Sequence, residues 1–191
     1  MEVLIATNNQ DKLKELQSIL KDFNLKTLNE LEIHTHVLED QKTYEENAQK
    51  KAKEIYNLSG IPTIADDSGL NIETLDNFPG IETHRFAGIT STDEIRNTIL
   101  LDKMQNKTNR KATFVTILAY YDGKHTVFGK GYLNGNISNE PKGNNGFGFD
   151  TIFEYNGKTL AQLTAEEKNK ISARKLAAID LRNNLKKSGI I

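Results

Sequence analysis

A run of six polar residues, Thr7 to Lys12, directly follows the short apolar segment Val3–Ala6. Leucines then recur at helical spacing from residue 13 to residue 20, so the pattern predicts a buried strand that leads into a helix. The free backbone N–H groups and the dipole at such a helix start favour an anion. The threonine, asparagine and lysine side chains of the run would add donors and a positive charge. The run therefore predicts an anion site, although an ordinary Asn-rich helix cap has the same composition.

A second group of reactive side chains is Asp66-Asp67-Ser68-Gly69, which stands between the β-prone segments 62–65 and 70–72. This arrangement predicts a pair of carboxylates at a strand break. Because successive side chains of an extended segment point to opposite faces, we expect the two carboxylates to have different partners. Mg²⁺ binds one or two protein carboxylates and completes its shell with water and phosphate oxygens. Glu39 is the candidate second ligand, and an Asp-rich turn without a metal is the alternative.

A third group lies in the segment Gly143–Asp150, which is rich in asparagine and glycine. Glycine lets a ligand approach the backbone closely, and Phe147 and Phe149 offer flat aromatic faces. Together they suit an aromatic base, with Asp150 binding a polar edge or a sugar. The alternative is a flexible loop whose phenylalanines return to the core.

The C-terminal part of the chain predicts one basic helix that opens at a capping box, Thr164 with Glu167, and runs to about Lys187. Most of its basic residues fit a solvated face. Arg174, however, falls on the same face as the apolar residues of the helix, and an inward guanidinium needs an anion or an acceptor. Lys168, near the helix start, is placed to join it.

Other elements predicted by hydrophobic spacing and turn residues surround these groups. Thr43 and Glu46 form a capping box that opens a helix ending at Ser59-Gly60. The remaining expectations are a helix at 92–104, strands at 25–28 and 34–38, and a hairpin of 111–121 with 124–133. A strand-helix opening combined with a long hairpin predicts a mixed sheet of the α/β or α+β class.

The length and composition of the chain exclude several classes of function. The chain has 191 residues, 25 Lys+Arg against 26 Asp+Glu, a net charge of −1 and no cysteine. One globular domain is expected at this length, and thiol nucleophiles and thiolate zinc sites are excluded. The balanced charge argues against a dedicated nucleic-acid binder. Because we find no signal peptide or membrane anchor, we expect a cytoplasmic protein.

Taken in order, several short motifs resemble one family, the inosine triphosphate pyrophosphatases, over nearly the whole chain. The motifs are Thr7-x-Asn9-x-x-Lys12, Glu46-Asn47-Ala48, Ala65-Asp66-Asp67-Ser68-Gly69-Leu70, Pro79-Gly80-Ile81, Gly146-Phe147-Gly148-Phe149-Asp150 and Leu163-Thr164-x-x-Glu167-Lys168. No motif is specific alone, whereas their joint occurrence in this order is.

The resemblance implies a single domain over residues 1–191 with an elongated, mixed-sheet α/β fold, in which two lobes flank a central nucleotide-binding cleft, and a homodimer. It implies Mg²⁺-dependent hydrolysis of ITP, dITP and XTP to the monophosphate and pyrophosphate, which removes deaminated purines from the nucleotide pool. The protein implied by the resemblance would bind a small nucleotide, not nucleic acid or a membrane.

The resemblance also implies a role for each matching residue. The triphosphate would contact Thr7, Asn8, Asn9, Gln10, Asp11 and Lys12, with Ser68 on a phosphate. Glu39 and Asp67 would hold the metal, and Asp67 is the family's proton acceptor. Because a carboxylate bound directly to Mg²⁺ is a poor base, Asp67 alternatively orients a water. The nucleoside would be bound by Phe147, Gly148, Phe149, Asp150, Lys168, Ala173 and Arg174.

Base selectivity follows from hydrogen bonding at purine position 6. Hypoxanthine and xanthine carry an acceptor oxygen there, and adenine carries an amino donor, so donors such as Lys168 and Arg174 in the implied nucleoside site would disfavour adenine. One departure bears on selectivity: the family commonly has Ser-His-Arg where this chain has Ser172-Ala173-Arg174.

Three alternatives stay open at this point. The first is a pyrophosphatase for standard or pyrimidine triphosphates, which the missing histidine permits. The second is a nucleotide sensor that binds without turnover. The third is an RNA- or DNA-binding module that uses the C-terminal basic helix.

Overall fold

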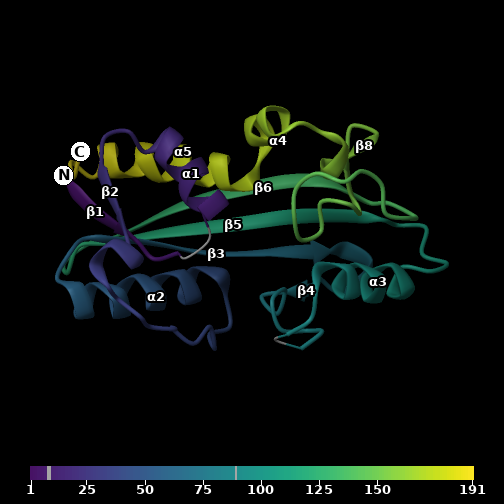
Figure 1. The fold of residues 1–191 in the computed structure, drawn as a ribbon, viewed down its shortest axis with the longest axis horizontal. Coiled ribbons are helices and arrows are strands. Elements are labelled where there is room, and N and C mark those ends of the chain that lie inside the picture. The colour runs from purple at the N-terminus through teal and green to yellow at the C-terminus, as the bar shows by residue number, and fades with distance from the viewer. Residues whose placement is uncertain (8–9, 89) are drawn as a thin grey trace. The chain divides into compact units, whose positions relative to one another are not determined.

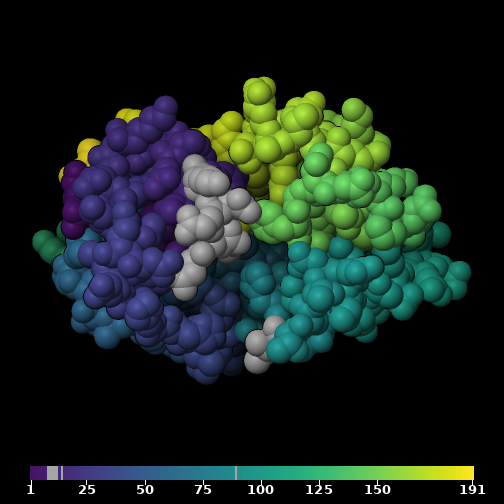
Figure 2. Space-filling model, viewed as in Figure 1, coloured from purple at the N-terminus to yellow at the C-terminus, as the bar shows by residue number. Residues whose placement is uncertain are grey.

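The computed structural model describes residues 1–7, 10–88 and 90–191, without the side chains of residues 10–12 and 14; residues outside this description are grey in Figure 2. The helices are α1 (Gln10–Ile19), α2 (Tyr44–Ser59), α3 (Asp93–Lys103), α4 (Ala165–Ile171) and α5 (Ala173–Lys187). The strands are β1 (Glu2–Ile5), β2 (Asn24–Thr27), β3 (Thr63–Ile72), β4 (Phe78–Gly80), β5 (Lys111–Tyr121), β6 (Thr126–Ile137), β7 (Phe153–Tyr155) and β8 (Lys158–Thr159).

The chain forms two compact units. Unit 1 comprises residues 1–68, 116–132 and 173–191, and unit 2 comprises residues 69–115 and 133–172. The strands hydrogen-bond in the order β2-β1-β3-β5-β6-β7-β8, and β4 pairs with β3. Strands β3, β5 and β6 contribute residues to both units.

Unit 1 is a helix-covered sheet. Strand β1 runs parallel to both β2 and β3. Helix α2 lies on one face of these strands, and α1 and α5 lie on the other (Figure 1). The Thr43 cap of α2 is confirmed, because Thr43 accepts a hydrogen bond from the Glu46 N–H and Gly60 ends the helix in the left-handed conformation. The other half of the predicted capping box differs, since the Glu46 carboxylate accepts from the Lys42 N–H at 3.2 Å.

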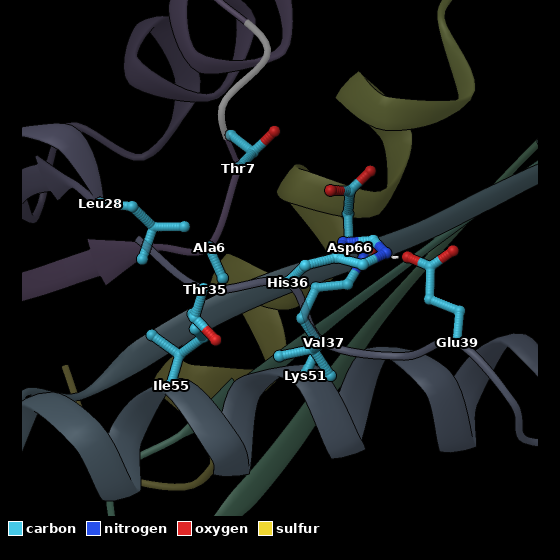
Figure 3. Close-up of a pocket in the computed structure, with 10 residues that line it drawn as sticks. All are labelled: Ala6, Thr7, Leu28, Thr35, His36, Val37, Glu39, Lys51, Ile55 and Asp66. Atoms are coloured by element: carbon cyan, nitrogen blue, oxygen red, sulfur yellow. Dashed lines mark hydrogen bonds and ion pairs between the residues drawn. The ribbon is translucent and has the colours of Figure 1, made fainter. Parts of the chain in front are cut away.

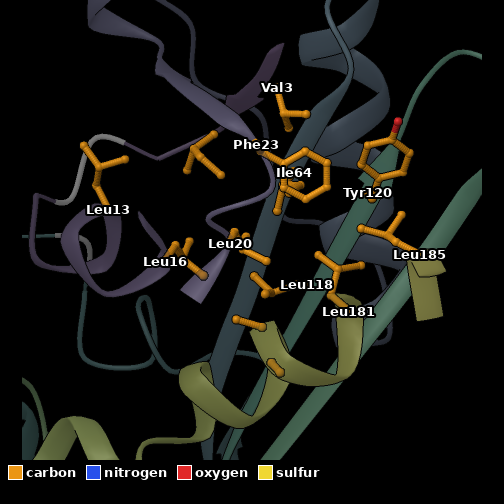
Figure 4. Close-up of a cluster of buried hydrophobic side chains, with 13 residues drawn as sticks. Val3, Leu13, Leu16, Leu20, Phe23, Ile64, Leu118, Tyr120, Leu181 and Leu185 are labelled. Carbon is orange, nitrogen blue, oxygen red and sulfur yellow. The ribbon is translucent and has the colours of Figure 1, made fainter. Parts of the chain in front are cut away.

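The core of unit 1 joins α1 and α5 to the sheet (Figure 4). It includes Leu16 from α1, Leu20 directly after that helix, Ile64 from β3, and Leu181 and Leu185 from α5. These residues recur at helical spacing along α1 and α5, which is why each helix presents one apolar face. Truncating a fully buried leucine in such a core typically costs about 2–5 kcal/mol.

Unit 2 is mainly antiparallel. Strand β4 pairs antiparallel with β3, and β7 pairs antiparallel with both β6 and β8. Backbone hydrogen bonds join Asp122 to His125 and Ile137 to Arg110, so β5 and β6 form the predicted hairpin. The structure extends β6 to Ile137, beyond the expected end at Leu133. Helix α3 begins after Thr92, whose side chain accepts from the Ile95 N–H.

Three expectations about single elements are wrong. Asp66 and Asp67 lie inside the continuous strand β3 and not at a strand break, since sheet pairing carries the strand through both acids. Residues 34–38, all described, form no strand, because Thr35, His36 and Val37 border a cavity instead of pairing with β2. The basic C-terminal helix is two helices, because Ser172 has an extended backbone between α4 and α5.

The predicted α/β class with a mixed sheet is confirmed, since parallel strands in unit 1 and antiparallel strands in unit 2 belong to one hydrogen-bonded order. Within the described part of the chain, we find no helix long and apolar enough to cross a membrane.

Candidate active site

A cavity of about 170 Å³ opens in unit 1 where β1 and β3 meet the segment that precedes α2 (Figure 3). It is lined by Ala6, Thr7, Leu28, Thr35, His36, Val37, Glu39, Lys51, Ile55 and Asp66. Two of the predicted site residues, Thr7 and Glu39, are therefore at one cavity although they are far apart in the sequence. The wall of the cavity holds the carboxylates of Glu39 and Asp66 and the ammonium group of Lys51, so it combines negative charge with a cation.

Asp67 is a buried carboxylate whose pKa departs strongly from its usual value. It lies within β3, is 3% exposed, and accepts a 2.9 Å hydrogen bond from Asn47 Nδ2 of α2. Burial raises the pKa of Asp67 to about 6, and the charge of Glu39 adds to the rise, while the hydrogen bond from Asn47 opposes it. A carboxyl group with a pKa near neutrality is suited to accept a proton at physiological pH.

Lys51 of α2 is the cation that partly balances these acids. Its ammonium group forms an ion pair with Glu39 and donates a 2.8 Å hydrogen bond to the backbone oxygen of Asp66. Burial by itself would lower the pKa of Lys51, but the charges of Asp66 and Glu39 outweigh it and raise the pKa. Lys51 is therefore protonated, and it holds Glu39 beside β3.

Asp66 and Ser68 lie on the other face of β3 from Asp67. The Ser68 hydroxyl is within hydrogen-bond distance of Asp66 Oδ2, at 3.3 Å, and of Thr116 Oγ1, at 3.1 Å. The two neighbouring carboxylates thus have different partners, Ser68 for one and Asn47 for the other, as the alternation of an extended strand predicts.

The sequence reasoning gave no role to Asn47 or Lys51. Both fall on the buried side of α2 beside Ala48, Ala52 and Ile55. Two polar residues four positions apart within an apolar helix face are the signal that identifies them, because a buried amide and ammonium require partners.

The raised pKa of Asp67 predicts a pH-dependent stability of the metal-free protein. Between the usual value of 3.8 and the folded value of about 6, the native state binds more protons than the unfolded state, so stability falls as pH rises through this window. We expect Asp67→Asn to remove that decrease and to raise the free energy of unfolding above pH 6 by up to about 3 kcal/mol.

Urea unfolding with a chelator at about pH 4.5 and about pH 7.5 measures this effect as the difference between wild type and variant, in which carboxylates that do not interact with Asp67 cancel. If the free energies of unfolding of variant and wild type differed by the same amount at both pH values, the raised pKa would not belong to Asp67.

The predicted metal ligands Glu39 and Asp67 interact electrostatically. Among the described residues, no group of three or more His, Asp or Glu side chains is arranged to hold a metal ion. Mg²⁺ needs only one or two carboxylates. Their mutual repulsion and the burial of Asp67 also fit a bound cation, because a positive charge would relieve both.

The predicted anion run is described only in part. Thr7 lines the cavity. Asn8 and Asn9 lie outside the described residues, and Gln10, Asp11 and Lys12 are described only as backbone of α1. Their expected contacts with phosphate therefore stay predictions.

The predicted aromatic loop and Lys168 come together within unit 2. Lys168 forms an ion pair with Asp150 and lies 4.3 Å from the centre of the Phe147 ring. Asp150 also accepts a 2.8 Å hydrogen bond from the Phe147 N–H. Phe149 is buried, whereas Phe147 is 42% exposed. One phenylalanine thus returns to the core and the other remains accessible.

Arg174 points inward, as predicted, and its partner lies in the same unit, unit 1. Its guanidinium forms a 2.8 Å ion pair with Glu15 of α1, and its side chain is 12% exposed. Its Nε is buried and has no hydrogen-bond partner among the described residues. Lys168 pairs with Asp150 instead, so the two cations predicted to act together have separate partners.

Ala173 begins α5 and is buried. A Cβ atom at Gly131 of β6 would come within 1.9 Å of the Ala173 carbonyl oxygen, so only glycine permits this approach. The close packing fixes the start of α5 and thereby the position from which Arg174 reaches Glu15.

Comparison with known proteins places this geometry in a family. A model of the Ham1 family matches residues 3–184. The chain belongs to the Ham1 family. The solved Ham1 protein of Staphylococcus aureus is 37% identical and superposes with a TM-score of 0.91 over 98% of this chain and 100% of its own. A HAM1 protein from Coxiella burnetii is 33% identical, also with a TM-score of 0.91, over 98% and 99% of the two chains.

Two relatives of this Ham1 family member carry the same name. A protein of Clostridium perfringens called dITP/XTP pyrophosphatase is 43% identical over 197 residues and 96% of both chains. A protein of Aquifex aeolicus with the same name is 40% identical over 185 residues and 91% of both chains. The family suggested by the sequence motifs is thereby confirmed.

Proposed function

We propose that this chain hydrolyses non-standard purine nucleoside triphosphates, namely ITP, dITP and XTP, to the nucleoside monophosphate and pyrophosphate. The observation that carries the proposal is the buried Asp67, with its raised pKa, beside Glu39 and Lys51 in unit 1. Relatives named dITP/XTP pyrophosphatase, similar over nearly their whole length, support this substrate class.

The chemistry suits hydrolysis of a phosphoanhydride. Such reactions depend on positioning and charge neutralisation more than on a covalent nucleophile. In this proposal Asp67 acts on the attacking water through a water shared with the metal and not as a direct ligand, so that it can orient that water and accept its proton. The Asn47 hydrogen bond fixes the direction of the carboxylate. Lys51, Ser68 and Thr7 supply a cation and hydroxyl groups for phosphate oxygens.

Glu39 and Asp67 are the residues proposed to hold Mg²⁺. The ion, when bound, would neutralise phosphate charge and orient water at the reacting phosphorus. Glu39 forms an ion pair with Lys51, so the lysine would help to fix the position of this proposed ligand.

Phe147, Asp150 and Lys168 of unit 2 are proposed to bind the nucleoside. The ring of Phe147 is accessible for stacking, and the ammonium of Lys168 is a donor suited to the 6-oxo group of hypoxanthine or xanthine. On the family resemblance, Arg174 is a second proposed donor to the nucleoside.

The chain is further proposed to act in the cytoplasm as a homodimer, on free nucleotides and not on nucleic acid or a membrane. The family resemblance supports this, and the net charge of −1 agrees with it. Sedimentation of the purified protein tests the dimer directly.

The deciding experiment incubates the purified protein and Mg²⁺ separately with ITP, XTP, ATP, GTP and TTP, and assays pyrophosphate against orthophosphate. Pyrophosphate from ITP and XTP alone supports the proposal and shows that Ala173 in place of histidine preserves selectivity. Turnover of the standard nucleotides would overturn the substrate class, and an absence of turnover with all five would overturn the enzyme assignment.

Lys168→Met is expected to raise KM for ITP about tenfold, because it removes the donor to the base and leaves Asp150 without its cation. Lys170→Met is the matched control, since Lys170 lies on the same helix and its side chain is 64% exposed beside Glu166. Steady-state kinetics of both variants with ITP measures the difference. Equal KM values for the two variants would remove Lys168 from the nucleoside site.

A further inference from the structure

Two side chains of helix α3 form hydrogen bonds with Gly148 of the proposed nucleoside loop. The Gly148 N–H donates a 2.6 Å hydrogen bond to Asp93 Oδ2, and Asn97 Nδ2 donates a 3.0 Å hydrogen bond to the Gly148 carbonyl oxygen. Asp93 and Asn97 are four residues apart, so both side chains leave the same face of the first turns of α3. Both backbone polar groups of one loop residue are thus fixed by one helix.

The two side chains are themselves held in place. Arg96 donates to the second oxygen of Asp93 at 2.7 Å and to Ser91 Oγ at 3.0 Å. Asn97 is 5% exposed, and its Nδ2 also donates to Thr151 Oγ1 at 2.9 Å, which commits both of its N–H groups. Burial would raise the pKa of Asp93, but Arg96 and the Gly148 N–H lower it, so the carboxylate is ionised.

Capping of the helix does not account for Asp93. The cap of α3 is Thr92, whose hydroxyl accepts from the Ile95 N–H. One carboxylate oxygen of Asp93 is directed at the loop instead. This contact is charge-assisted, and such hydrogen bonds are roughly twice as strong as neutral ones.

Gly148 determines the direction of the side chains around it. Its φ of 64° lies in the left-handed region, so the chain turns sharply between the exposed Phe147 and the buried Phe149. A change at this peptide would rotate the Phe147 ring relative to Lys168 and Asp150.

We propose that Asp93 and Asn97 are positioning residues for nucleoside binding, which hold Gly148 so that Phe147 presents its ring beside Lys168. The inference rests on the proposed function, because that function assigns this loop to the nucleoside. Neither residue touches the reacting phosphate in this scheme, so their loss acts on substrate affinity more than on the chemical step.

Four variants test the inference. Asp93→Ala removes the acceptor of the Gly148 N–H, and Asp93→Asn retains an acceptor oxygen without the charge. Asn97→Asp keeps the shape of the buried side chain but removes both N–H donors. Glu94→Ala is the matched control, because Glu94 is an exposed acid of the same helical turn; of its hydrogen bonds, the one described is accepted by its backbone oxygen.

Two measurements separate positioning from a general loss of structure. Hydrogen–deuterium exchange on the nucleotide-free protein is expected to show loop amides at 146–150 exchanging about tenfold faster in Asp93→Ala and Asn97→Asp. In steady-state kinetics with ITP, the same variants are expected to raise KM about tenfold and to change kcat less than about twofold. Asp93→Asn should recover most of both effects, and Glu94→Ala should match wild type.

The inference is overturned if loop exchange and KM in Asp93→Ala equal those of Glu94→Ala while wild type hydrolyses ITP. It is also overturned if kcat falls as much as KM rises, since that would indicate a role in chemistry or folding. Failure of the proposed function gives a different result: wild type itself would release no pyrophosphate from ITP.

Discussion

Asp67→Asn is expected to lower kcat for ITP hydrolysis about a thousandfold, with little change in the fold. The amide can still accept the hydrogen bond from Asn47, so the packing around β3 is preserved. It cannot accept a proton near neutral pH and is a weaker metal ligand, and loss of a general base typically costs about 10²–10⁴-fold in rate. Initial rates of pyrophosphate release with saturating ITP and Mg²⁺ measure the change.

The stability experiment on the same variant is the control for folding. A variant that is more stable than wild type near pH 7.5 without metal, and yet inactive, has lost chemistry and not structure. Full activity in a folded Asp67→Asn protein would exclude Asp67 from catalysis. The pH profile of kcat/KM of wild type gives a second readout, because a base in the free enzyme produces an acidic limb at its pKa.

Glu39→Gln is expected to raise the Mg²⁺ concentration needed for half-maximal rate by about tenfold or more, and to lower kcat/KM about a hundredfold at limiting Mg²⁺. The variant removes one of two proposed carboxylate ligands, while its amide oxygen can still accept from Lys51. Activity titrated with Mg²⁺ at fixed ITP separates this effect from a loss of nucleotide binding.

Asp40→Asn is the matched control for Glu39. Asp40 is the next residue in the sequence, more exposed than Glu39, and paired with Lys50 at 2.7 Å. An ion pair at the surface is screened by solvent and contributes little, so this variant should retain the Mg²⁺ dependence of wild type. If the two variants shift the Mg²⁺ requirement equally, Glu39 is not a specific ligand.

Much of the local structure was predictable because its causes are close together in the sequence. The Thr43 cap, the apolar face of α2 and the stop at Gly60 involve residues within a few positions of one another. The hairpin β5–β6 follows from two β-prone runs joined by a short turn. The order of the motifs also indicated the family and its chemistry.

The expectations that failed depended on contacts between distant residues. Asp66 and Asp67 interrupt an apolar pattern, yet neighbouring strands pair through them and keep β3 continuous. The segment 34–38 alternates as a strand does, but it borders the cavity and does not pair with the edge strand β2. The helix break at Ser172 is not predictable from local sequence, because no glycine or proline stands there.

The sequence alone determined which residue types this protein has for its chemistry: paired aspartates, an aromatic glycine loop and basic residues near the C-terminus. Only the tertiary structure decided their partners. Lys51 holds Glu39, Arg174 meets Glu15 across 159 positions of sequence, and helix α3 holds Gly148. The reason is that a charge or a loop carries no local signal of its partner, because the energy of a buried pair arises only when folding removes both groups from water.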